Sequence, residues 1–318
     1  MSNSPVIRFE HLSKTYGGRK RQVRALRDLN LAIEAGQVFG FLGPNGAGKT
    51  TTIRLLLGLI HPTEGSAYLF GQDVHQNPDI VRRVGSLVEG AAFYGFLTGR
   101  QNLEVLDRTA DEHNPVRIDQ LLEQVGLADK AEQRVKGYST GMKQRLGLAA
   151  ALLRDPDVVI LDEPTNGLDP AGIQEMRSFI RELVDDHGKT VFLSSHLLNE
   201  VEQVCDRVAI IQNGRMIKHG AVTELLADGQ AELRIQAQPV EQAFDVLAEN
   251  WPVVRDNGWL VVQTHAEESP AIVSRLVENQ VRVYQVLTQR QSLESLFMEV
   301  TRNNGDLKED APEEAPHA

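Results

Sequence analysis

The chain has 318 residues, enough for two domains, and 41% of them are hydrophobic, as is ordinary for a globular protein. Its formal net charge of -11 disfavours broad nucleic-acid binding, and no apolar stretch approaches the ~20 residues that a membrane-spanning helix needs. The single cysteine, Cys205, excludes an internal disulfide, and residues 1–16 lack the apolar core of a signal peptide. We therefore expect a cytoplasmic protein that binds no nucleic acid.

The first informative elements are a strand, a glycine-rich loop and a helix in succession. Residues 38–42 form an apolar run that predicts a buried strand, and residues 51–59 predict a helix. Between them stands the pattern Gly-x-x-x-x-Gly-Lys-Thr, made of Gly43, Pro44, Asn45, Gly46, Ala47, Gly48, Lys49 and Thr50. Such a loop curls its backbone N–H groups around phosphate, and the following helix points its N-terminus at the same anion. This setting disfavours a glycine-rich turn that matches by chance.

The side chains at the end of this loop predict a nucleoside triphosphate and Mg²⁺ as ligands. Lys49 can reach the β- and γ-phosphates, and the Thr50 hydroxyl can ligate Mg²⁺. Thr51, at the start of the helix, completes the expected nucleotide-binding segment.

A second acidic motif follows further along the chain. Asp162 and Glu163 come directly after the apolar run 158–161, which predicts a strand. In a phosphate-loop NTPase, an Asp in this place holds Mg²⁺ through its water shell, and an adjacent Glu can polarise the attacking water. Many strands end in acids, so this motif is weak alone and becomes strong only together with the loop at 43–50.

The alternation of strands and helices predicts the fold class. Residues 6–218 alternate β-branched runs with helical patterns, which is typical of an α/β core with a mostly parallel sheet, and about 98–155 an inserted helical lobe interrupts them. From residue 221 the order βα-ββαβ predicts a small ferredoxin-like α+β domain with a trailing helix. We therefore expect a nucleotide-binding domain at 1–220, an accessory domain at 221–302 and a disordered acidic tail at 303–318.

A third motif lies between the loop and the acidic pair. Residues 138–145 read Tyr-Ser-Thr-Gly-Met-Lys-Gln-Arg and resemble the Leu-Ser-Gly-Gly-Gln signature of ATP-binding-cassette (ABC) ATPases. Tyr138, Thr140 and Met142 depart from that signature, whereas Ser139 and Gly141 keep it. A serine and a glycine at a helix start form an anion site, but an ordinary N-cap uses the same residues, so the motif alone leaves both interpretations open.

The order of the remaining pieces also resembles the ABC family, over about two-thirds of the chain. Tyr16 stands where the family has an adenine-stacking aromatic ring, and His196 stands at its switch histidine. Residues 166–169 match its D-loop, and Glu89 lies near its Q-loop position, where a Gln is usual. A carboxylate is also a hard oxygen donor for Mg²⁺, so whether Glu89 ligates the ion or only belongs to the coupling loop stays open.

The resemblance implies a mechanism. Two nucleotide domains would sandwich two ATP molecules head to tail, and Ser139 and Gly141 of one chain would act on the ATP held by its partner. Glu163 would be the general base, and His196 would fix the γ-phosphate and the water. A membrane permease would dock near residues 89–105, where three aromatic residues either contact it or pack in the lobe's own core. These are Phe93, Tyr94 and Phe96.

Residues 84–98 resemble one ABC subgroup in particular, the ATPases of bacitracin, lantibiotic, daunorubicin and sodium exporters. We therefore expect the ATPase subunit of an exporter, bound to the inner face of the cell membrane through its permease and paired with itself or a related ATPase. The alternative is a soluble ABC ATPase that acts on ribosomes or DNA. Such proteins usually carry two cassettes or long coiled coils, which this sequence lacks. The transported substrate cannot be inferred from the residues.

Overall fold

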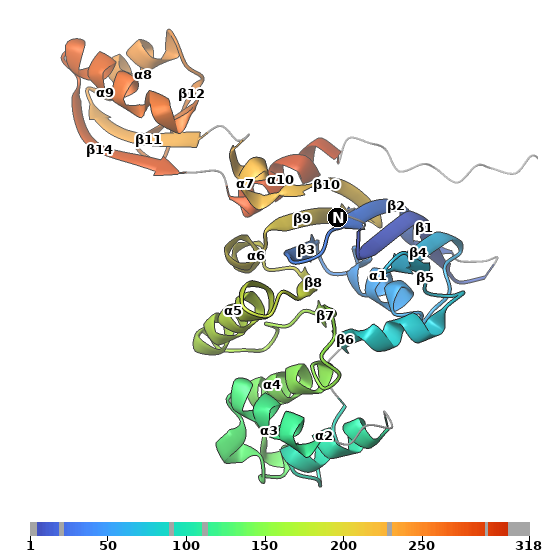
Figure 1. Cartoon of the computed structure of the whole chain (residues 1–318). Helices are drawn as coiled ribbons and strands as arrows, with labels where there is room; N and C mark the ends of the chain where they lie inside the picture. Colours follow the sequence, from blue (N-terminus) through green and yellow to red (C-terminus); the bar gives the residue numbers. More distant parts are fainter. Residues whose placement is uncertain are drawn as a thin grey trace, which may run out of the picture. The chain divides into compact units, whose positions relative to one another are not determined.

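The computed structural model describes residues 5–18, 22–88, 92–109, 114–227, 231–289 and 292–304. The chain divides into two compact units, residues 1–220 and 221–318 (Figure 1). Within the described ranges, no helix is long and apolar enough to span a bilayer.

A six-stranded sheet forms the centre of the first unit, with the order β10-β9-β3-β8-β7-β6 among the described residues (Figure 1). Its strands are β3 (Val38–Leu42), β6 (Val84–Leu87), β7 (Val158–Asp162), β8 (Thr190–Ser195), β9 (Arg207–Gln212) and β10 (Arg215–Ala221). The pairs β6–β7, β7–β8, β8–β3 and β3–β9 are parallel. All residues of β3, β7 and β8 are buried, as expected for apolar strands that are covered on both faces.

An antiparallel sheet with the order β2-β1-β4-β5 completes the strand framework of this unit. Its strands are β1 (Ile7–Tyr16), β2 (Val23–Ile33), β4 (Glu64–Leu69) and β5 (Gln72–Asp73). Helix α1 (Lys49–Leu56) packs against β2 and β4 of this sheet and against β7 of the parallel sheet. Phe9 and Phe41, one from each sheet, belong to a single buried cluster with Ile53 of α1. The helix that follows the glycine-rich loop is therefore anchored in the main core.

The helices of the first unit include the predicted lobe. They are α2 (Gly99–Arg108), α3 (Pro115–Gln124), α4 (Thr140–Ala151), α5 (Pro170–Asp185) and α6 (Leu198–Val204), with short 3₁₀ turns at Pro78–Arg83, Ala128–Lys130 and Val135–Gly137. Thr98 and Gln101 form a reciprocal capping box at the start of α2, and Asn114 caps α3. Helices α2, α3 and α4 contact one another and make up the inserted lobe. The expected α/β phosphate-loop fold with a helical subdomain is confirmed.

The second unit contains a four-stranded antiparallel sheet with the order β12-β13-β11-β14. Its elements are β11 (Ala231–Gln238), α8 (Val240–Ala248), β12 (Val253–Asp256), β13 (Trp259–Thr264), α9 (Ser269–Glu278) and β14 (Arg282–Gln289). A 3₁₀ turn lies at Ala266–Glu268, and α7 (Val222–Ala227) and α10 (Leu293–Asn304) flank the sheet in the sequence. This chain order and strand order are those of a ferredoxin-like sandwich, as the sequence predicts.

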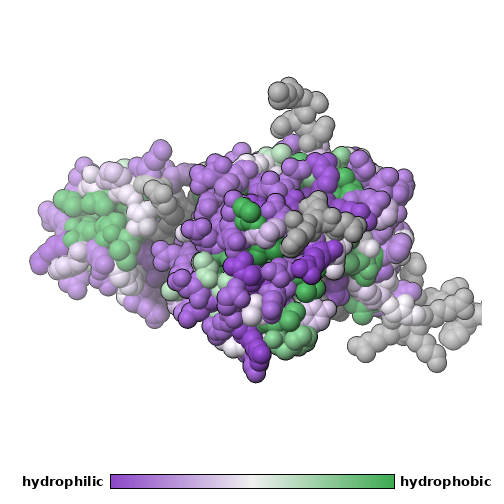
Figure 2. All heavy atoms as spheres, turned by 60° about the horizontal axis from the view of Figure 1, so that its bottom comes forward, coloured by the Kyte–Doolittle hydropathy of each residue, from purple (hydrophilic) through white to green (hydrophobic). Residues whose placement is uncertain are grey.

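The last helix of the second unit ends later than the sequence predicts. Helix α10 runs to Asn304, so residues 303 and 304 are helical although the sequence analysis assigns them to the tail; residues 305–318 lie outside the described ranges. Helices α8 and α9 pack on the sheet, and strand β11 buries alternate residues, among them Leu233 and Ile235. Figure 2 shows hydrophobic side chains gathered on this unit. Among the exposed hydrophobic residues of the unit are Val254 and Leu287. Trp251 packs against the core of the unit.

One histidine near the antiparallel sheet gives the first testable prediction. Burial holds the pKa of His75 below the ordinary value of about 6.5, and the charge of His61 lowers it further. The centres of the two imidazole rings lie 4.7 Å apart. The folded state then binds fewer protons than the unfolded state as the pH falls below that value, so the free energy of unfolding decreases there. His75→Phe keeps the ring and removes the titration. We expect denaturant unfolding between pH 7 and 5 to give a shallower loss of stability for this variant; equal slopes would contradict it.

Candidate active site

The glycine-rich loop connects β3 to α1 and needs glycine at defined points. Gly46 and Gly48 have positive φ angles of 81° and 111°. A Cβ atom on Gly48 would lie 2.4 Å from the Ala25 carbonyl oxygen, and one on Gly43 would lie 2.3 Å from the Ile211 carbonyl oxygen. Both distances are far below van der Waals contact, so β2 and β9 leave no room for side chains at these two positions. The loop therefore runs as a bare backbone between two strands.

Lys49, the first residue of α1, lies folded back over the loop. Its side chain is only 7% exposed, and its Nζ donates to the carbonyl oxygens of Gly43 at 2.7 Å and Pro44 at 3.3 Å. The same Nζ lies 3.1 Å from Oε1 of Glu163. The folded chain thus brings the loop lysine and the predicted base together, although 114 positions separate them in the sequence (163 minus 49).

Asp162 ends β7 directly beside α1. Its Oδ2 accepts a hydrogen bond of 2.9 Å from the Thr50 hydroxyl, and its Oδ1 accepts one from the Ser194 hydroxyl. Asp162 and Ser194 are register partners on the parallel strands β7 and β8. The sequence analysis misses Ser194; two serines at the end of an otherwise apolar strand were the available signal.

The donor set around Asp162 fits a magnesium ion. Mg²⁺ is usually bound through one or two protein oxygens, together with waters and substrate phosphates. The Thr50 hydroxyl and the Asp162 carboxylate are hydrogen-bonded to each other and supply such oxygens beside the loop. Throughout the described ranges, no group of three or more His, Cys, Asp or Glu side chains could hold a metal on its own. The third expected ligand, Glu89, lies outside the described residues.

Glu163 occupies a strained backbone position between β7 and α5. Its φ of 51° is uncommon for a residue with a side chain and is typical of functional sites. Its N–H is held by the hydroxyl and the carbonyl oxygen of Ser194, at 3.1 and 3.2 Å. Its Oε2 lies 2.7 Å from Nδ1 of His196, which follows β8. Of the three predicted catalytic residues, Glu163, His196 and Lys49, the first two therefore form a hydrogen-bonded pair.

Tyr16 is the last residue of β1 and lies opposite Val23 of β2. It is 37% exposed, and Nζ of Lys14 lies 5.2 Å from the centre of its ring. The ring is accessible enough to stack against a base. Among the described residues, no hydrogen bond joins Tyr16 to the loop at 43–50.

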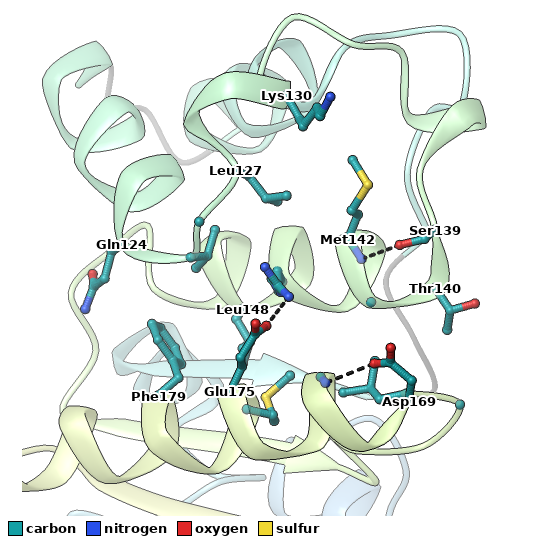
Figure 3. Close-up of a pocket in the computed structure, with 18 residues that line it drawn as sticks. Gln124, Leu127, Lys130, Ser139, Thr140, Met142, Leu148, Asp169, Glu175 and Phe179 are labelled. Carbon is teal, nitrogen blue, oxygen red and sulfur yellow. Dashed lines mark hydrogen bonds and ion pairs between the residues drawn. The ribbon is translucent and has the colours of Figure 1, made fainter.

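The signature-like stretch forms the N-terminus of α4. Ser139 is its N-cap, and the Ser139 hydroxyl accepts a hydrogen bond of 3.2 Å from the N–H of Met142 (Figure 3). Ser139 therefore caps the helix, and it is exposed while Gly141 is half-buried. Tyr138, which departs from the family signature, is buried and donates to the Lys130 carbonyl oxygen at 2.7 Å. It thus helps to hold the helical lobe together.

A pocket of about 820 Å³ separates α4 from α5, with Ser139 and Thr140 at one end and Gln124 at the other (Figure 3). An ion pair between Arg145 of α4 and Glu175 of α5 crosses it. Asp169, the last residue of the D-loop-like segment, caps α5 by accepting from the N–H of Gly172 at 2.9 Å. Ser139 and Gly141 therefore line this pocket together with residues 167–169 of the same chain.

The aromatic residues before α2 fall into two groups. Phe96 and Tyr94 are 68% and 54% exposed, and their rings contact each other at 5.8 Å, whereas Phe93 is half-buried. Asn102, which is buried, bonds the N–H and the carbonyl oxygen of Tyr94. Packing inside the lobe therefore does not account for Tyr94 and Phe96.

The comparisons with known proteins agree with this geometry. The ABC transporter family profile matches residues 26–166. The bacitracin transport ATP-binding protein of Bacillus licheniformis is 39% identical over 93% of this chain and 97% of its own length. The daunorubicin resistance ATP-binding protein of Streptomyces coeruleorubidus is 37% identical over 96% of this chain and 99% of its own length.

The fold has the same relatives. The structure of cbiO1 from Clostridium perfringens, part of an ABC transporter complex, superposes with a TM-score of 0.63 at 26% identity and covers 71% of this chain and 92% of that chain. The phosphate loop, the Asp162–Glu163 pair and His196 stand together in a fold of this kind. The chain therefore belongs to the ATP-binding proteins of ABC transporters, binds ATP and is an ATPase.

Proposed function

We propose that this chain powers an exporter, with ATP-driven closure of two nucleotide domains and their reopening after hydrolysis moving a separate permease. The observation that carries the proposal is the cluster in which Glu163 lies 2.7 Å from His196 and 3.1 Å from Lys49, at the mouth of the loop. A carboxylate, an imidazole and a buried cation in this arrangement suit the hydrolysis of a bound triphosphate.

Each residue of the cluster has a distinct role in the proposed reaction. The N–H groups of the loop at 43–50, Thr51 beyond it, and Lys49 bind the phosphates, while Tyr16 stacks on the adenine. Glu163 accepts the proton of the attacking water, and His196 orients Glu163 and the γ-phosphate. Mg²⁺, when bound, neutralises charge on the phosphates. Thr50 and Asp162 would hold it, with Glu89 as the further candidate ligand.

The complete site requires a second nucleotide domain. Ser139 is exposed and Gly141 is half-buried at the start of α4, and within the described residues no hydrogen bond joins either of them to the phosphate loop of their own chain. We assign them to the ATP bound by the partner, because a helix N-terminus with free N–H groups is suited to a γ-phosphate. The partner is a second copy of this chain or a related ATPase.

Two observations support a permease and outward transport. Tyr94 and Phe96 are exposed side by side beside α2, and aromatic residues of this kind are enriched in protein interfaces. Relatives that match almost the whole chain are a bacitracin transport protein and a daunorubicin resistance protein. We therefore place the chain on the inner face of the cell membrane, held there by its permease and bound to no nucleic acid.

A pull-down tests this function. Tagged Glu163→Gln protein is bound to ATP, solubilised with its partners in mild detergent and analysed by mass spectrometry. Recovery of a multi-span membrane protein, lost with Tyr94→Ser/Phe96→Ser, supports the proposal. Recovery of ribosomal or DNA-bound proteins without a membrane subunit would replace it with the soluble alternative.

A further inference from the structure

Gln144 makes a contact that the proposed catalytic roles leave unexplained. It lies in the second turn of α4, five residues after Ser139, and its Nε2 donates a hydrogen bond of 2.9 Å to the carbonyl oxygen of Pro164. Pro164 is buried and directly follows Glu163. A buried carbonyl oxygen needs a donor, and here a side chain from the helical lobe supplies it.

The pocket makes this contact important. A pocket of about 820 Å³ lies between α4 and α5, so the two helices are not packed against each other along their whole length (Figure 3). Two polar contacts join α4 to the segment 163–185 within the described ranges. One is the exposed Arg145–Glu175 ion pair, and the other is the bond from Gln144 to Pro164.

The backbone of Glu163 depends on its neighbours to stay in place. Its φ of 51° is unfavourable for a glutamate, so surrounding bonds must hold it. Ser194 holds the Glu163 N–H, and the Glu163 carbonyl oxygen accepts from the N–H of Asn166 at 3.1 Å. The bond from Gln144 restrains the next peptide, on the side that faces the helical lobe.

We infer that Gln144 is a positioning residue that links the start of α4, where the partner's ATP would bind, to the base Glu163 of its own chain. The inference rests on the proposed function, since it assumes that Glu163 is the base and that Ser139 faces the partner's nucleotide. Displacement of α4 by a partner would pull on the Pro164 carbonyl oxygen and so adjust the carboxylate of Glu163. Gln144 itself touches neither ATP nor water.

The main test is Gln144→Met, which keeps the length of the side chain and removes the donor. We expect kcat of ATP hydrolysis to fall about five-fold, which corresponds to one hydrogen bond of average strength. KM for ATP should change by less than about two-fold, because Gln144 does not contact the phosphate loop. A purely structural role would lower thermal stability without this separation of kcat from KM.

Two further variants complete the test. Gln144→Glu places a carboxylate against the Pro164 carbonyl oxygen, so we expect a larger loss of kcat than with Gln144→Met. The circular dichroism spectrum of this variant should match that of the wild type. Gln37→Met is the matched control. Gln37 is buried, whereas Gln144 is half-buried, and like Gln144 it donates through Nε2 to a backbone carbonyl oxygen, that of Glu34 at 3.0 Å. It precedes β3 at the end away from the loop. Its removal should leave kcat unchanged.

The outcomes distinguish this inference from the proposed function. If Glu163→Gln abolishes hydrolysis while folded Gln144→Met and Gln144→Glu both keep the wild-type kcat, the positioning role is wrong and the proposed base stands. If Gln37→Met lowers kcat as much as Gln144→Met, the effect is general destabilisation and the positioning role is again wrong. If Glu163→Gln itself retains turnover, the assignment of the base fails, and the role of Gln144 fails with it.

Discussion

Glu163→Gln is expected to lower ATP turnover by about 100-fold or more while ATP binding remains. The amide has nearly the same shape as the carboxylate but cannot accept a proton from water. It can still accept a hydrogen bond from His196, so the geometry of the pair at 2.7 Å should survive. Loss of the charge also ends the ion pair with Lys49 and leaves that cation free for phosphate. The variant should therefore hold ATP and accumulate as an ATP-bound dimer.

Phosphate release measures turnover, and size-exclusion chromatography with and without ATP measures dimer formation. Glu182→Gln is the control, because it removes an exposed carboxylate on α5 that pairs only with His187 in the described structure. It should behave as the wild type in both assays. Wild-type turnover in Glu163→Gln would remove Glu163 as the base, and weakened ATP binding in that variant would mean that it also shapes the nucleotide site.

The phosphate loop could be predicted from the sequence because its chemistry is local. Strand, glycines, lysine and helix follow one another within residues 38–59, and each position constrains the next. Gly48 illustrates the limit of this reasoning. Its positive φ is expected from the loop type, but its closest constraint is the Ala25 carbonyl oxygen on β2, which no local pattern reveals.

The contacts between distant segments could not be predicted in the same way. That Ser194 bonds Asp162 follows from the register of two parallel strands, which amino-acid types alone do not define. The bond from Gln144 to Pro164 depends on how the helical lobe is placed against the parallel sheet. The role of His196 was accessible only because its place along the chain resembles that of a known family, whereas the role of Glu163 also follows from its position after Asp162. Their distance of 2.7 Å required the fold.

The ferredoxin-like unit was predictable for a different reason. Strand β11 alternates buried and partly exposed residues with period two, and helix α9 buries one face through Ile272 and Leu276, so these element types follow from periodicity. The end of α10 was misplaced because the composition turns polar gradually beyond residue 300. Helix ends without a strong cap or a proline are the least defined boundaries in a sequence.

The second large effect is expected from Lys49→Ala, which should weaken ATP binding by about 100-fold. Charge-assisted hydrogen bonds contribute roughly 1.5–3 kcal/mol each, and a buried, directed cation is at the upper end of that range. Lys49 is 7% exposed and is held in place by the carbonyl oxygens of Gly43 and Pro44. Its removal also leaves the Glu163 carboxylate without its cation, so that it repels the incoming phosphates.

Isothermal titration calorimetry with ATP measures this loss, and Lys189→Ala provides a closely matched control. Lys189 is also largely buried and, like Lys49, bonds a backbone carbonyl oxygen and a carboxylate, those of Pro156 at 2.9 Å and Asp155 at 2.7 Å. It lies before β8, away from the phosphate loop, so its removal should cost stability but leave ATP affinity intact. Equal losses of affinity in the two variants would mean that both bind ATP less well because they are less stably folded. Unchanged affinity in Lys49→Ala alone would show that the loop N–H groups bind the phosphates without the lysine, and that its role is to hold Glu163.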